Sequence, residues 1–243
     1  MKKLMLGLLG AALLAGCGGE TNTIKMITEA TFPPYEFMRG QEIVGIDVEI
    51  CRAVAAKLGK TFKSETVDFD SVIPAVISGK ADLAAAGITV TEDRKKNVDF
   101  SVPYVKTGIV VIYKKDNPFT DAEQLKGKKI GVQGGTTSEN YVLENLKQEP
   151  ERSRSPAEAV AGLKAGRVEF VIADIDPAKN CVKGEADLAL SDFITSEEYA
   201  VAIRKGQPEL LKAINETIAE LKASGQLDKW IADFTAEADK LKD

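Results

Sequence analysis

The residues best suited to chemistry in this sequence would hold an anion. Arg94 follows Thr91 by three residues at an expected helix start, and its planar guanidinium suits a carboxylate. Segment 134–138 (GGTTS) joins an expected strand, 129–133, to a helix around 141–146, so free backbone N–H groups and hydroxyls there also favour an anion. The segment lacks the Gly-Lys-Ser/Thr ending of a phosphate-binding loop. The plain alternative for Arg94 is a surface arginine at a helix start.

The composition excludes several classes of mechanism. The chain has 243 residues and no histidine, which excludes histidine-based triads, general bases and metal ligands. Its three cysteines, Cys17, Cys51 and Cys181, are too few and too scattered for a cysteine-only metal site or a disulfide framework. The formal charge is −5 and no basic block stands out, which argues against a nucleic-acid partner. We expect no metal and no cofactor.

Two segments of the chain share one pattern. In each, a helix ends at a glycine, Gly79 or Gly166, and a basic residue and then a buried strand follow. Eight residues after these glycines stand Gly87 and Asp174, just past the carboxyl ends of the strands. Ligands of open α/β sheets bind at that edge. The pattern is also a frequent connection between elements, but it favours two similar lobes facing one another.

Short apolar strands alternate with amphipathic helices, which predicts an α/β fold with largely parallel sheets. The expected strands are 24–28, 82–86 and 169–173, and the expected helices include 47–58, one capped by Asp70 that runs to Ile77, and one that begins at Ser155-Pro156. Segments 107–115 and 199–205 are strand-like and would cross between the lobes as a hinge. Lobe 1 would then comprise residues 24–107 and 200–243, and lobe 2 residues 108–199.

The first 16 residues have the features of a removable signal peptide, with a basic start and an apolar run too short to span a bilayer comfortably. Residues 14–17 (LAGC) resemble the bacterial lipobox, in which the cysteine is acylated after cleavage. An ordinary secretory signal with a chance cysteine is the alternative. Residues 17–23 would be a tether, and the processed chain would carry 30 − 37 = −7 charges. We expect an exported protein anchored to the cell membrane through lipid on Cys17.

Six further motifs carry a family resemblance. They are TFPPYEF (31–37), GIDVE (45–49), FDSVIPA (69–75), GITVTEDR (87–94), DFSVPY (99–104) and GVQGGTT (131–137). Together with the lipobox, they resemble the family 3 extracellular solute-binding proteins, which bind polar amino acids for bacterial ABC importers. The resemblance covers the whole mature chain. It implies a two-lobed periplasmic-binding-protein type II fold, each lobe a mostly parallel sheet flanked by helices, with a two-strand hinge and the ligand in the cleft.

The resemblance also assigns roles at both ends of an amino acid. It implies a carboxylate held by Arg94 and the loop with Thr136 and Thr137, and an ammonium held by Asp174, Thr89 and the Gly87 carbonyl. Because these groups come from both lobes, the ligand would drive closure of the cleft.

The side chain of the ligand would lie between Phe32 and Phe69, with Glu29 near its far end. An acid and two aromatic faces suit a guanidinium or ammonium, which favours arginine or lysine. Gln133 and Asp176 would instead suit an amide such as glutamine, so the identity of the side chain stays open.

The sequence therefore predicts a monomeric, non-enzymatic receptor that delivers an amino acid to a permease and its ATPase. One alternative is an exported lyase on the same scaffold, similar to cyclohexadienyl dehydratase, which would need a general acid over a hydroxyl-bearing ring. Another is a sensor or adhesion lipoprotein that binds its ligand without transport. Cys51 and Cys181 fall in helices of different lobes, where a disulfide would lock the hinge, so we expect partly buried thiols.

Overall fold

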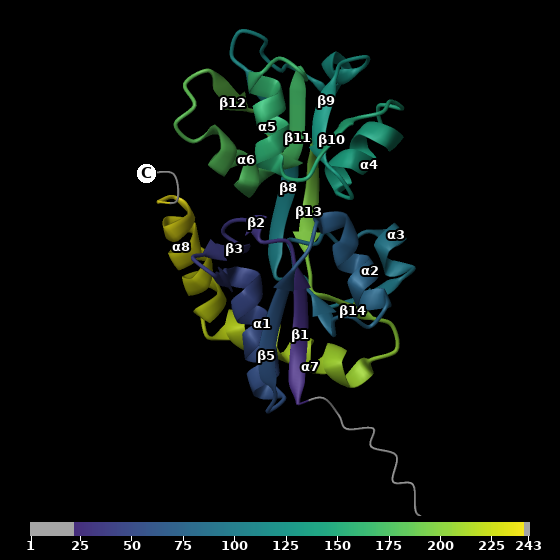
Figure 1. The fold of residues 1–243 in the computed structure, drawn as a ribbon, viewed down its shortest axis with the longest axis vertical. Helices are drawn as coiled ribbons and strands as arrows, with labels where there is room; N and C mark the ends of the chain where they lie inside the picture. Colours follow the sequence, from purple (N-terminus) through teal and green to yellow (C-terminus); the bar gives the residue numbers. More distant parts are fainter. Residues whose placement is uncertain (1–21, 241–243) are drawn as a thin grey trace, which may run out of the picture.

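The computed structural model describes residues 22–240 and shows two α/β lobes stacked along the long axis of the molecule (Figure 1). We call the elements around the five-stranded sheet lobe 1 and those around the six-stranded sheet lobe 2. Two strands, β8 (Val105–Lys114) and β13 (Thr195–Tyr199), connect the lobes as an antiparallel pair. The predicted two-lobed architecture is confirmed.

The sheet of lobe 1 mixes parallel and antiparallel neighbours. Its order is β5 (Thr61–Thr66), β1 (Thr23–Thr28), β6 (Leu83–Ala84), β14 (Ala202–Arg204) and β7 (Val98–Phe100), and a small antiparallel sheet of β2 (Thr31–Phe32), β3 (Glu36–Arg39) and β4 (Glu42–Val44) lies beside it. Strands β5, β1 and β6 are parallel, whereas β14 is antiparallel to both of its neighbours. Residues 83–86 of the expected strand 82–86 are buried, but only Leu83 and Ala84 pair in the sheet.

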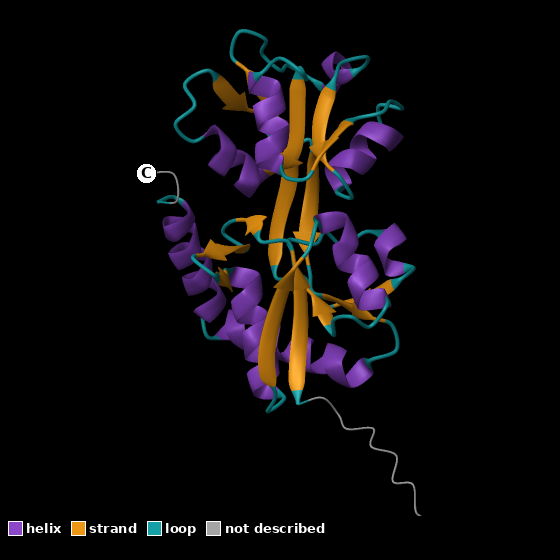
Figure 2. Cartoon of the chain, in the orientation of Figure 1, coloured by secondary structure: helices purple, strands orange, loops and turns teal. Residues whose placement is uncertain are grey.

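Helices cover both faces of this sheet (Figure 2). One face carries α1 (Ile46–Lys57), α7 (Pro208–Ala223) and α8 (Gln226–Ala238), and the other carries η1 (Phe69–Ser71) and α2 (Val72–Ile77), with α3 (Glu92–Lys95) against β7. The repeat of apolar residues in α1 has the predicted effect, because Ile46, Ile50 and Val54 are fully buried.

The predicted N-cap role of Asp70 is wrong. A short 3₁₀ turn, η1, precedes α2, so Asp70 lies within the turn and its carboxylate accepts a hydrogen bond from the Ser71 hydroxyl at 3.0 Å. The stop at Gly79 is as expected: the residue has φ +76° and its N–H bonds to the Val76 carbonyl.

The sheet of lobe 2 is also mixed rather than largely parallel. Its order is β10 (Glu151–Ser153), β9 (Ile130–Gln133), β11 (Phe170–Asp174), β8 and β12 (Leu188–Leu190), with β13 also paired to β8. Strands β10, β9 and β11 are parallel, as the repeat predicts, but β8 is antiparallel to β11. The reason is the hinge: β9 and β11 end at the cleft, whereas β8 enters the lobe from the cleft and must run the opposite way.

Helices sandwich this sheet too. Helices α5 (Pro156–Lys164) and α6 (Ile175–Val182) cover one face, and α4 (Thr137–Glu144) covers the other with η2 (Ala122–Leu125). Ser155 caps α5 as predicted, since its hydroxyl accepts the Glu158 N–H at 3.2 Å. Helix α4 begins earlier than expected, at Thr137, and ends at Glu144. We call the residues just before it, 134–136, the glycine-rich loop.

The predicted second hinge crossing, 199–205, is wrong. The structure places the crossing at Thr195–Tyr199, paired with β8 from Thr195 opposite Ile109 to Tyr199 opposite Val105. Most of the predicted segment 199–205 belongs to lobe 1, where β14 lies between β6 and β7. Residues 195–199 and 202–204 both have the composition of a strand. Only the strand with which each one pairs shows which of them crosses between the lobes. The C-terminal helices do return to lobe 1, where they pack on α1.

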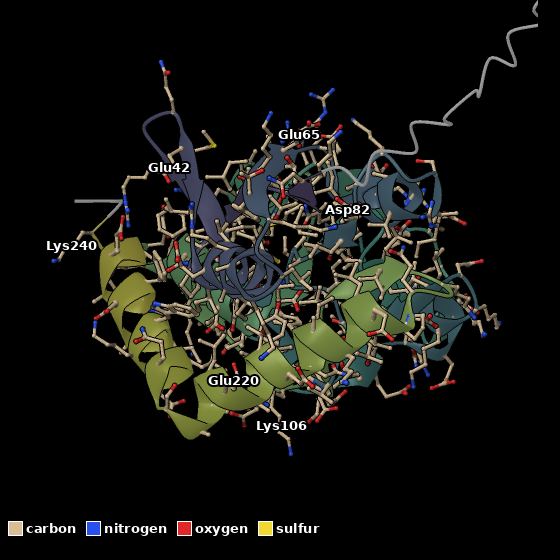
Figure 3. All side chains as sticks on the ribbon, turned by 90° about the horizontal axis from the view of Figure 1, so that it is seen from below. Glu42, Glu65, Asp82, Lys106, Glu220 and Lys240 are labelled. Atoms are coloured by element: carbon tan, nitrogen blue, oxygen red, sulfur yellow. The ribbon has the colours of Figure 1, made fainter. Side chains whose placement is uncertain are left out.

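The surface carries both signs of charge, as the outward-pointing Glu65, Lys106 and Glu220 show in a view from below lobe 1 (Figure 3). Within residues 22–240, no helix has the length and apolar character needed to cross a membrane. Cys51 is fully buried in α1, and Cys181 is half-buried in α6 against the lobe 2 core. Cys17 and the predicted signal peptide lie outside the described residues.

Candidate ligand-binding site

A small cavity lies between the lobes at the carboxyl ends of their central strands. It is lined by Phe32, Phe69, Ala86, Gly87, Thr89 and Arg94 from lobe 1 and by Gln133, Thr136, Thr137 and Asp174 from lobe 2. Every predicted site residue except Glu29 and the alternative contact Asp176 is in this lining, and Ala86 is added. Four separate motifs and both copies of the repeated pattern therefore meet at one place.

Arg94 spans the cleft at one end of the cavity. The Thr91 hydroxyl caps α3 by accepting the Arg94 N–H at 3.2 Å, which fixes where the side chain begins. Its Nη1 donates to the Thr89 carbonyl at 2.8 Å, and its Nη2 donates across the cleft to the Gly135 carbonyl at 3.0 Å. The guanidinium carbon lies 5.5 Å from the centre of the Phe69 ring. Burial lowers the pKa of Arg94 below its ordinary value, while nearby carboxylates oppose that shift.

The glycine-rich loop is held by its own polar groups. The Thr136 hydroxyl donates to the Gln133 carbonyl at 2.7 Å and accepts the Glu139 N–H at 3.3 Å. The Gly135 N–H donates to the Glu139 carboxylate at 2.6 Å, and the Gly134 N–H donates to a backbone carbonyl of β10. The expectation that these N–H groups are free for an anion is therefore wrong for both glycines. What the loop offers the cavity is the start of α4 with Thr136 and Thr137.

Asp174 provides a buried carboxylate at the lobe 2 side of the cavity. It ends β11, and its Oδ1 accepts a hydrogen bond from the Tyr199 hydroxyl at 2.6 Å. Burial and then the charge of Glu197 raise the pKa of Asp174, while Tyr199 and Arg94 act in the opposite direction, and the net value is about 7. Neither Tyr199 nor Glu197 was a sequence candidate, because their place beside Asp174 follows from the pairing of β13 with β8.

Gly87 is fixed from behind by a buried acid that the sequence reasoning also missed. The Gly87 N–H donates to Asp47 Oδ2 at 2.9 Å, and the Tyr104 hydroxyl donates to Asp47 Oδ1 at 2.6 Å. Burial raises the pKa of Asp47 to about 6 and that of the neighbouring Glu36 well above its ordinary value. Gly87 has φ +54°, and a Cβ there would come within 2.7 Å of the Phe32 ring. The GIDVE motif that contains Asp47 was the available signal.

Glu29 lies just behind the cavity wall. It is 6% exposed and accepts the Thr31 hydroxyl at 2.6 Å, but its Oε2 has no hydrogen-bond partner within residues 22–240. Burial raises the pKa of Glu29, while Gln133 lies close enough to oppose the shift. The amide of Gln133 donates to the Arg154 carbonyl at 2.9 Å. Asp176 is not part of the cavity lining and instead accepts the Tyr35 hydroxyl at 2.8 Å.

The cavity thus presents a cation and an anion on opposite lobes, with Phe32 and Phe69 also in its lining. Within residues 22–240 no group of histidine, cysteine or acidic side chains could hold a metal ion. The sequence from 24 to 237 matches the bacterial extracellular solute-binding proteins, family 3. The chain belongs to that family.

Relatives of known name and structure agree with this assignment. The chain is 34% identical to the arginine-binding extracellular protein ArtP of Bacillus subtilis, covering 94% of this chain and 96% of ArtP. It is 31% identical to the L-cystine-binding protein TcyJ of Escherichia coli, covering 96% and 97%. Among solved structures, an ancestral arginine-binding protein bound to arginine matches with a TM-score of 0.80 and 40% identity, covering 88% of this chain and 98% of that one.

Proposed function

We propose that this family 3 protein is the substrate-binding component of an amino-acid ABC importer and that the inter-lobe cavity takes the amino acid. The observation that carries the proposal is the placement of Arg94 and Asp174 on opposite lobes around one small cavity. A free amino acid has a carboxylate and an ammonium on one carbon, so it would pair with both side chains at once. Neither lobe alone satisfies both charges, so binding favours the closed arrangement.

The preferred ligand in this proposal is a basic amino acid, arginine before lysine. Phe32 and Phe69 offer aromatic faces to a cation, and Glu29 is a buried acid with one oxygen unpartnered among the described residues. Glutamine is less well supported, because the Gln133 amide already donates to a backbone carbonyl and Asp176 lies outside the cavity lining. Named relatives that bind arginine support the same choice.

The proposal extends to location and assembly. The processed chain would begin at Cys17, carry lipid there and stay tethered through residues 17–23 to the outer face of the cell membrane. Lobe 1 would comprise residues 24–107 and 200–243, and lobe 2 residues 108–199. The closed monomer would then dock on a permease whose ATPase drives import.

The two alternative functions have less support. A dehydratase-like lyase would need a general acid over a hydroxyl-bearing ring, whereas Arg94 and Asp174 match the two charges of an amino acid. Prephenate turnover can be measured by absorbance, and a lack of turnover would count against the lyase. A sensor lipoprotein would use the same cavity, and a neighbouring permease gene with its ATPase would distinguish import from sensing.

The direct experiment is thermal-shift screening of residues 22–243 against the twenty common amino acids, ornithine and cystine, followed by calorimetry of the hits. A basic amino acid should raise the melting temperature most. Glu29→Gln should weaken arginine binding and leave neutral ligands unaffected, with exposed Glu65→Gln as the matched control in the neighbouring strand. If no amino acid raises the melting temperature at millimolar concentration, the proposed function is wrong.

A further inference from the structure

Glu197 lies on the hinge strand β13 and contacts a predicted ligand-binding residue. Its Oε2 accepts the Thr89 hydroxyl at 2.6 Å, and its side chain is half-buried. Thr89 lines the ligand cavity on one side and a wider groove on the other, and Glu197 lines that groove. Thr89 therefore separates Glu197 from the space where an amino acid would bind.

This hydrogen bond decides whether the Thr89 hydroxyl can donate or accept a hydrogen bond in the cavity. An ionised carboxylate only accepts hydrogen bonds, and a threonine hydroxyl has one proton to donate. Because Thr89 gives that proton to Glu197, it presents only lone pairs to the cavity. Lone pairs accept hydrogen bonds from an ammonium group and repel a carboxylate. Thr89 is thus set as an acceptor before any ligand arrives.

The neighbouring acid is arranged in the same way. Asp174 Oδ1 takes the only proton of the Tyr199 hydroxyl, so this contact engages one oxygen of the carboxylate and brings no donor toward the ligand. Glu197 and Asp174 are close enough for their charges to repel, and Arg94 offsets part of that repulsion. A cation placed between Thr89 and Asp174 would relieve it. This corner of the cavity therefore presents acceptors and negative charge.

We propose that Glu197 is a positioning residue that makes the site select an α-ammonium over an α-hydroxyl group, by holding Thr89 as a hydrogen-bond acceptor. The inference deepens the proposed amino-acid-binding function and rests on it. Its ligand class is the L-α-amino acids as opposed to the corresponding α-hydroxy acids. An α-hydroxyl group has one proton to donate, whereas an ammonium group has three. The hydroxyl therefore donates to fewer of these acceptors, and because it is neutral it does not offset the negative charge of Asp174 and Glu197.

The test compares L-arginine with its α-hydroxy analogue by calorimetry, in the wild type, Glu197→Gln and Glu198→Gln. If screening selects another amino acid, that amino acid and its α-hydroxy acid replace the pair. Glu197→Gln removes the charge that holds the Thr89 proton, and its amide can donate to Thr89 as well as accept from it, so the hydroxyl is no longer fixed as an acceptor. We expect arginine affinity to fall about tenfold or more, the scale of a hydrogen bond to a charged group, with little change for the analogue. Glu198 is the adjacent, exposed acid on the same strand, and its variant should match the wild type.

A second variant tests the route of the effect. In a Thr89→Val background, Glu197→Gln should cause little further loss, because the hydroxyl it positions is gone. Equal weakening of both ligands by Glu197→Gln, or no change in arginine affinity, would overturn the inference while leaving amino-acid binding intact. A wild-type protein that binds no amino acid would overturn the proposed function itself.

Discussion

Among residues 22–240, two sets of contacts join the lobes outside the hinge, and they differ in kind. In the cavity, Arg94 donates across the cleft to the Gly135 carbonyl, and this guanidinium is also a predicted ligand contact. On the α6 side, Asn180 donates to the Pro33 carbonyl at 2.8 Å, Tyr35 donates to Asp176, and Lys183 donates to the Asp239 carbonyl. None of the α6-side residues lines the cavity. Closure therefore has a part that competes with the ligand and a part that is independent of it.

The comparison separates two ways of setting affinity. The cavity contact is made by the partly buried charge of Arg94, which is also a predicted ligand contact, so changes there alter which ligand binds and how tightly. The α6-side contacts change only the fraction of molecules in the closed state, which scales the affinity for every ligand by one factor. Substitutions and pH changes that affect one set at a time therefore test this division.

Removing the cavity cation should have the largest effect. Arg94→Ala should weaken amino-acid binding about a hundredfold or more, because the ligand carboxylate would be buried without a partner. Calorimetry with the preferred ligand measures this loss. Lys95→Ala, the next residue of α3 and an exposed one, is the control and should keep wild-type affinity. Retained tight binding by Arg94→Ala would show that the carboxylate is held elsewhere.

Acidic pH should affect binding and stability in opposite directions. An ammonium needs an ionised Asp174, whose pKa is about 7, so affinity should fall by up to about tenfold per pH unit below that value. In the empty protein the folded pKa values of Asp174 and Asp47 exceed those of the unfolded chain. The folded state therefore binds more protons between about pH 4 and pH 7, and stability falls as pH rises through that window.

Calorimetry at several pH values and denaturant melts of the empty protein measure the two trends. Asp174→Asn should remove most of the pH dependence of affinity above pH 5 and should stabilise the empty protein at pH 8. Parallel trends in affinity and stability would contradict the assignment of Asp174 to the ligand.

Changes on the α6 side should be smaller and independent of the ligand. Asn180→Ala removes a part-buried inter-lobe hydrogen bond, so affinity should fall about two- to tenfold by the same factor for every amino acid that binds. Small-angle scattering of the empty protein should show a more open average shape. Asn117→Ala, in an exposed turn of lobe 2, is the control. A loss that differs between ligands would break the division between the two sets.

The smallest effect is expected at Lys183. Its ammonium meets the end of α8 in an exposed contact, so Lys183→Ala should change affinity by less than about threefold. The difference from wild type should shrink further when calorimetry is repeated in high salt, since exposed ion pairs are screened. A large loss at Lys183 would mean that α8 contributes to closure more than its exposure indicates.

The sequence predicted the cavity lining better than the network behind it. Arg94 lies at a helix start inside a family motif, and Asp174 lies just past a strand end, so the local pattern and the resemblance together assign both residues to the cleft. Glu197 reaches Thr89 only because β13 pairs with β8 in one register, and no local pattern contains that register. The mistaken second crossing has the same origin, since strand composition does not identify a partner.

The position of β14 has a consequence for the order of folding. Lobe 2 is built from one continuous stretch, so its sheet can assemble as soon as β13 has been synthesised. Lobe 1 cannot, because β14 separates β6 from β7 and its main core also needs α7 and α8. The first half of the chain must therefore wait for the last, with apolar surface on β1 and α1 exposed meanwhile. The last 40 or so residues, which contain β14, α7 and α8, therefore complete lobe 1, the lobe whose synthesis begins first.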